Sequence, residues 1–84
     1  MIDLVVARAS ENDEVLVGAV LNGEEVSFYI SREAIEDRLG LTHISFSRCI
    51  DELQQHWDRF AGPLERLVSE HGEGSHITTH MFKP

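Results

Sequence analysis

The chain has 84 residues, of which 42% are hydrophobic and 26% charged, and its fifteen acidic side chains outnumber its seven arginines and lysines to give a net charge of −8. This composition is typical of a single small globular domain, residues 1–84, and excludes a largely disordered chain. The acidic balance, with no basic stripe, makes nucleic acid or an anionic membrane an improbable partner, because phosphate contacts supply most non-specific affinity.

The single cysteine, Cys49, excludes an internal disulfide and a zinc cluster built from several thiolates. It lies beside Ile50 on an apolar helical stripe, which favours a buried inert thiol over a nucleophile. No segment is long and apolar enough to span a bilayer, and the amino end lacks the features of a secretion signal. We therefore expect a cytoplasmic protein.

Three runs of alternating apolar and polar residues predict three strands, starting near Ile2, Val15 and Val26. The polar residues 10–13 form the first turn, and Asn22-Gly23 is typical of a two-residue type I′ hairpin. These turns fix a register. It places the following pairs opposite each other: Leu4 and Ala19, Val6 and Val17, Ala19 and Val26, Val17 and Phe28, Val15 and Ile30.

Two helices are predicted next. Ser31 is suited to cap the first, and Gly40 is suited to end it. Thr42 or Ser45 begins a long second helix, within which Gly62-Pro63 predicts a kink or a short break. The apolar residues of the second helix follow at alternating intervals of four and three: Phe46, Ile50, Leu53, Trp57, Phe60, Leu64 and Leu67. We expect this stripe to pack on the sheet.

The β-branched run within Ser75 to Phe82 predicts a last strand. The predicted fold is therefore an α+β two-layer sandwich in the order β-β-β-α-α-β. An antiparallel three-strand meander and a C-terminal strand form the sheet, and a short and a long kinked helix cover one of its faces.

The segment from Asn22 to Arg48 carries a family resemblance. Its hairpin leads into the run ISREAIED, which starts at Ile30, and Phe46 and Arg48 follow early in the long helix. The segment resembles the short bacterial proteins grouped as domain of unknown function family 1488, in which a strand ending in Ile-Ser runs into Glu-Ala-Leu-Glu-Asp. The resemblance implies a small α+β bacterial cytosolic protein, and it implies no reaction because the family's function is unassigned.

Three histidines near the carboxyl end, His71, His76 and His80, are candidate metal ligands. On a strand, His76 and His80 point the same way but lie about 13 Å apart, too far to chelate one ion. Helical spacing would bring them together, but the β-branched residues between them oppose a helix. We therefore favour solvated histidines and expect no metal and no cofactor.

The segment from Ile35 to Ile50 resembles a bacterial helix-turn-helix, with a helix ending at Leu39-Gly40 and a capped second helix. Its reading face would be Thr42, His43, Ser45, Ser47 and Arg48. Glu36 stands where such motifs need a small residue, the second helix is too long, and the net charge opposes approach to phosphate.

No nucleophile-base-acid order, phosphate-binding glycine loop or catalytic carboxylate pair can be made out, and we expect no enzyme activity. The second face of the predicted sheet is more apolar than solvation requires, and it carries the candidate interface residues Val5, Leu16, Val20 and Tyr29. The leading hypothesis is a non-enzymatic protein-protein interaction module whose partner is another protein or, in a homodimer, a second copy. The alternatives are a DNA-binding regulator and a histidine metal site.

Overall fold

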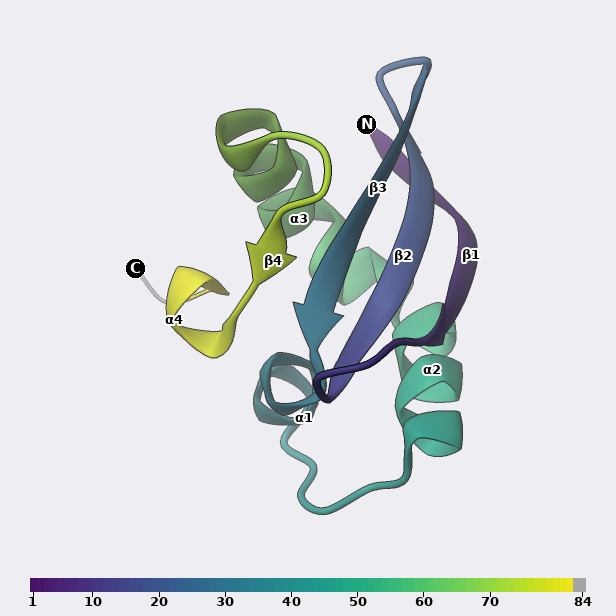
Figure 1. Ribbon diagram of the computed structural model, residues 1–84, viewed down its shortest axis with the longest axis vertical. Coiled ribbons are helices and arrows are strands. Elements are labelled where there is room, and N and C mark those ends of the chain that lie inside the picture. The colour runs from purple at the N-terminus through teal and green to yellow at the C-terminus, as the bar shows by residue number, and fades with distance from the viewer. Residues whose placement is uncertain (83–84) are drawn as a thin grey trace.

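The computed structural model describes residues 1–82, and these residues form an α+β fold with strands and helices in two layers (Figure 1). The elements in chain order are β1 (Ile2–Ala9), β2 (Glu14–Leu21), β3 (Glu24–Ser31), α1 (Arg32–Leu39), α2 (Phe46–Gln55), α3 (Trp57–His71), β4 (His76–Ile77) and α4 (Thr79–Phe82). The predicted α+β class and the order β-β-β-α-α-β are confirmed.

The strands form one mixed sheet in the order β1-β2-β3-β4, with β1 to β3 antiparallel and β4 parallel to β3. In Figure 1, α3 runs behind the sheet and emerges beside β3, and α2 lies by the lower end of β1. Both helices pack against β1. Phe28, Leu53 and Phe60 are fully buried between the two layers, so one face of the sheet and the apolar helix stripe share a single core.

The hairpin register is confirmed along the whole of β2 and β3, where Val17 lies opposite Phe28. The pair Leu4 and Ala19 is also confirmed, but the expected pair Val6 and Val17 is wrong. A β-bulge between Leu4 and Val6 shifts the register by one residue, so that Val6 lies opposite Gly18. A shift of one residue exchanges the two faces of a strand. Val6 is therefore turned away from the core.

The predicted strand from Ser75 to Phe82 is wrong beyond Ile77, because the chain turns into α4 at Thr79. The cause lies in the partner strand. Tyr29 and Ile30 of β3 pair with β4, but β3 ends at Ser31, which caps α1, so no strand continues beside residues 79–82.

The long second helix is divided at His56 and not at Pro63, which lies within α3. Next to the break, the indole nitrogen of Trp57 donates to the carbonyl oxygen of Ile2 at 3.1 Å. Proline at position 63 has no N–H for the carbonyl of Arg59, four residues earlier. That oxygen instead accepts a hydrogen bond of 2.7 Å from Nε of Arg38. A side chain from α1 thus replaces the missing helical bond.

None of the helices within residues 1–82 combines the length and apolar character needed to cross a membrane.

Candidate functional site

The face of β1 to β3 that is turned away from α2 and α3, called the open face below, is the candidate site. In Figure 1 no helix of residues 1–82 lies in front of it. Strand pairing arranges its side chains in three rows across the sheet: an end row of Asp3, Val20 and Glu25, a middle row of Val6, Gly18 and Ser27, and an opposite end row of Arg8, Leu16, Tyr29 and His76.

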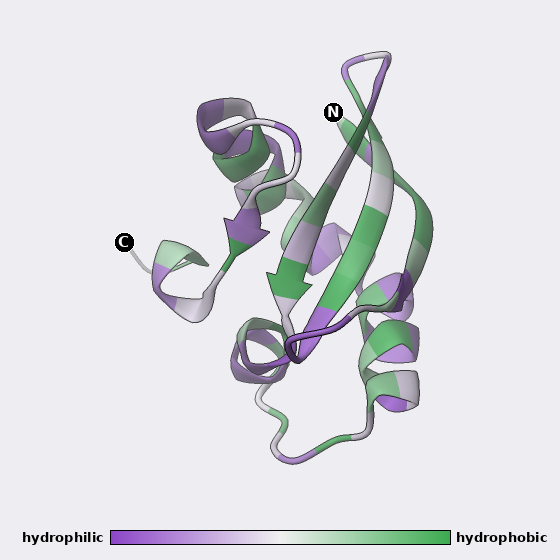
Figure 2. Cartoon of the chain, viewed as in Figure 1, coloured by the Kyte–Doolittle hydropathy of each residue, from purple (hydrophilic) through white to green (hydrophobic). Residues whose placement is uncertain are grey.

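The open face carries apolar side chains in contact with solvent. Val5 is 67% exposed and Val6 is 43% exposed, while Leu16, Val20 and Tyr29 are half-buried. In Figure 2, the middle of β1 is hydrophobic and the turn that connects β1 to β2 is hydrophilic. The structure thus places all four predicted interface residues where a partner can reach them, and the bulge adds Val6.

Gly18 shapes the centre of the open face. A Cβ atom at this position would lie 2.9 Å from Cγ1 of Val6, so the side chain of Val6 lies over the glycine. Beside it is a shallow hollow of about 290 Å³ whose lining includes Val5, Ser27 and Glu73. The hollow is open to solvent and has a mostly apolar lining, which suits a protruding side chain of a partner.

A polar cluster that the sequence did not reveal lies at the Arg8 end of the open face. Glu14 is the one charged residue among those described that is buried, and its Oε2 lies 2.7 Å from Nδ1 of His76. The ring of His76 stacks on that of Tyr29 with centroids 4.6 Å apart. Glu14 and His76 are separated by 62 residues, so local sequence patterns carry no sign of the contact.

The cluster borders a second cavity of about 530 Å³, which Ser10 also lines. A serine, a histidine and a carboxylate in one cavity invite comparison with a hydrolase triad, in which the base must bond the nucleophile. Within residues 1–82, no hydrogen bond joins Ser10 to His76. The contacts of His76 with Glu14 and Tyr29 orient its imidazole and fix β4 to the start of β2.

The three histidines proposed as metal ligands lie on different elements: His71 ends α3, His76 is in β4 and His80 is in α4. In the part of the chain that the structure describes, no three His, Cys, Asp or Glu side chains form a group that could hold a metal ion.

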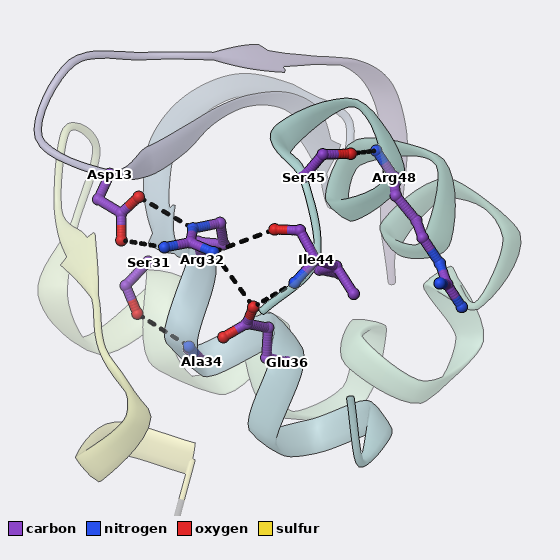
Figure 3. A network of polar contacts seen from close by, with 8 residues as sticks. All are labelled: Asp13, Ser31, Arg32, Ala34, Glu36, Ile44, Ser45 and Arg48. Atoms are coloured by element: carbon purple, nitrogen blue, oxygen red, sulfur yellow. Dashed lines mark hydrogen bonds and ion pairs between the residues drawn. The ribbon is translucent and has the colours of Figure 1, made fainter. Parts of the chain in front are cut away.

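Arg32 lies just before the helix-turn-helix-like segment and holds its inter-helix connection in place (Figure 3). Its guanidinium bonds both carboxylate oxygens of Asp13 at 2.9 and 3.2 Å, the carboxylate of Glu36 at 3.2 Å and the carbonyl oxygen of Ile44 at 3.0 Å. The hydrogen bond to Asp13 raises the pKa of Arg32 above its ordinary value. Glu36 in turn accepts from the backbone N–H of Ile44 at 3.0 Å. The network fixes the α1-α2 connection to the start of α1.

This geometry argues against sequence-specific DNA binding by the segment. Residues 40–45 connect α1 to α2, a longer connection than the about three to four residues of a helix-turn-helix. The position that should be small holds Glu36, which is committed to the connection. Arg48 points away from the network in Figure 3 and pairs with Glu52 of its own helix at 3.7 Å.

Cys49 is completely buried, and burial raises the pKa of its thiol to about 11. The thiolate is the nucleophilic form of cysteine. A buried, protonated thiol has neither the access nor the charge state for catalysis.

Comparisons with protein-family models, with curated proteins and with solved structures gave no match to this chain. The resemblance of residues 22–48 to domain of unknown function family 1488 stays a prediction.

Proposed function

We propose that this chain is a non-enzymatic protein-protein interaction module that binds a folded partner through the open face. The observation that carries the proposal is the apolar centre of that face, where Val5 and Val6 are solvent-exposed and no helix of residues 1–82 covers the sheet. Exposed apolar patches with polar rims are typical of protein-binding surfaces.

The chemistry of the open face favours a protein over other ligands. Its rim carries Asp3, Glu25 and Glu73 with Arg8 as the opposing charge, so a polyanion would be repelled from most of it. The hollow beside Gly18 and the larger cavity at the Arg8 end are both open to solvent, whereas small-molecule sites bury most of their ligand. A partner that presents an apolar patch with charges of both signs around it meets these requirements.

The proposal includes a bacterial cytoplasmic location. The resemblance implies it, and the free, buried Cys49 is compatible with a reducing compartment.

Site-specific photo-crosslinking in living cells tests the proposal. A photoreactive amino acid replaces Val6 at the centre of the open face, and a matched control replaces Gln54, an exposed residue of α2 on the other side of the molecule. We expect protein adducts of discrete mass from position 6 and none from position 54. The absence of adducts at position 6, or identical adducts from both positions, would refute the proposal.

A further inference from the structure

The charges of the open face are unevenly distributed between its two ends. Asp3 and Glu25 flank Val20 in one end row, and Arg8 lies in the other end row with Leu16 and Tyr29. Between residues 20 and 16 of β2 the rows are about 13 Å apart, at about 3.3 Å per residue. Among residues 1–82, none of Asp3, Glu25 and Arg8 forms an ion pair. These charges are available to a partner.

We propose that the partner of the open face is a second copy of the chain, turned end for end about a two-fold axis that runs along the middle row. This inference rests on the proposed function of the open face and names its occupant. This rotation places each strand of one copy opposite the same strand of the other copy. It also brings the end row that contains Asp3 opposite the other copy's end row that contains Arg8. Sheets packed face to face keep their strands nearly aligned, as this arrangement does.

The exchange produces a complementary contact at every position of the end rows. Asp3 of one copy faces Arg8 of the other, and Val20 faces Leu16. Glu25 faces Tyr29, whose hydroxyl can donate to a carboxylate, while the neighbouring His76 stays engaged with Glu14 of its own copy. By symmetry each contact is made twice.

The middle row is suited to lie on the axis because its residues are small or apolar. Gly18 has no side chain and Ser27 a short one, so the two backbones can approach, while the two copies of Val6 meet each other. The alternative two-fold axis, parallel to the strands, would place acidic row on acidic row. The distribution of charge therefore selects one orientation.

The size of the open face limits the affinity that we expect for the dimer. Three strands of 8 residues span about 27 Å by 14 Å. Interfaces of this size are smaller than those of stable complexes and are typical of weak, transient ones, so the dimer should exchange with monomer at about micromolar to millimolar concentration. The net charge of −8 on each copy opposes association. At physiological ionic strength, repulsion between charges more than about 8 Å apart is largely screened. The charged pairs in direct contact across the interface therefore decide whether the dimer forms.

Charge reversal tests the orientation. In an Asp3→Arg homodimer, both contacts between positions 3 and 8 bring two positive charges together, and in an Arg8→Asp homodimer both bring two negative charges together. We expect each variant alone to dimerise about tenfold more weakly than the wild type in sedimentation equilibrium at physiological salt. An equimolar mixture of the two variants restores opposite charges at both contacts. The mixture, and the doubly substituted chain, should therefore associate about as tightly as the wild type.

Restored association in the mixture also shows that both variants are folded. A wild type that stays monomeric up to millimolar concentration would overturn the inference. It would leave the proposed function intact if position 6 still crosslinks to another protein in cells. Single variants that dimerise as tightly as the wild type, or a mixture that associates no better than its components, would likewise overturn it.

Discussion

Arg38 and Pro63 should be energetically coupled, although they lie on different helices. Arg38→Met removes the donor to the carbonyl of Arg59, a charged hydrogen bond that we estimate at about 1 kcal/mol in this exposed setting. It also removes the guanidinium that lies 5.4 Å from the ring centre of Phe82, a contact of about 0.5–1 kcal/mol. The free energy of unfolding should therefore fall by about 1.5–2 kcal/mol.

In a Pro63→Ala background the helix regains a backbone N–H that can bond the Arg59 carbonyl itself. Arg38→Met should then cost only the contact with the Phe82 ring, which gives a coupling of about 1 kcal/mol between positions 38 and 63. Urea unfolding followed through the fluorescence of Trp57, the single tryptophan, measures all four chains. Arg48→Met on α2 is the matched control and should show no coupling to Pro63→Ala. A coupling between positions 38 and 63 within about 0.3 kcal/mol of zero would refute the reasoning.

Arg32→Met should lower the free energy of unfolding by about 2–3 kcal/mol, because it leaves the half-buried carboxylate on α1 unpaired. Asp13→Asn, at the exposed end of the same network, should cost less than about 1 kcal/mol in the same urea titration. Gly18→Ala should cost about 1 kcal/mol by displacing the side chain of Val6, and Val6→Ala should relieve that cost; an equal cost in both backgrounds would contradict the contact. As the pH rises from 9 to 11, the unfolded chain should lose the thiol proton of Cys49 first, because its pKa is about 11 when folded against 9.0 when unperturbed. The wild type should therefore lose stability relative to Cys49→Ala across that window, and parallel curves in urea titrations would argue against it.

Local signals in the sequence predicted the parts of the fold that local chemistry decides. Asn22-Gly23 fixed the register of β2 and β3 because a two-residue loop permits only one pairing. Ser31 and Gly40 marked both ends of α1, where the structure shows a side-chain cap and a left-handed residue.

The features that the sequence did not predict depend on contacts between distant segments. The bulge beside Val5 leaves no mark in the sequence, because Val5 and Val6 are both suited to a regular strand. The helix break at His56 adjoins a residue that contacts Ile2, and the polar cluster joins Glu14 to His76. Periodicity describes one element at a time, so it cannot show where two elements meet. Strand alternation alone placed Leu16, Val20 and Tyr29 on the face away from the helices, and the structure has them on that face.

The bulge in β1 has a consequence for how large an assembly can grow. An exposed edge strand invites other sheets to add to it without limit, and such addition needs a regular row of free backbone groups. Here the row is interrupted at Val5, and the indole of Trp57 occupies the carbonyl of Ile2. Growth along the edge is thereby hindered. Contact through the flat side of the sheet is self-limiting, since a two-fold pair leaves neither copy with a second surface of the same kind.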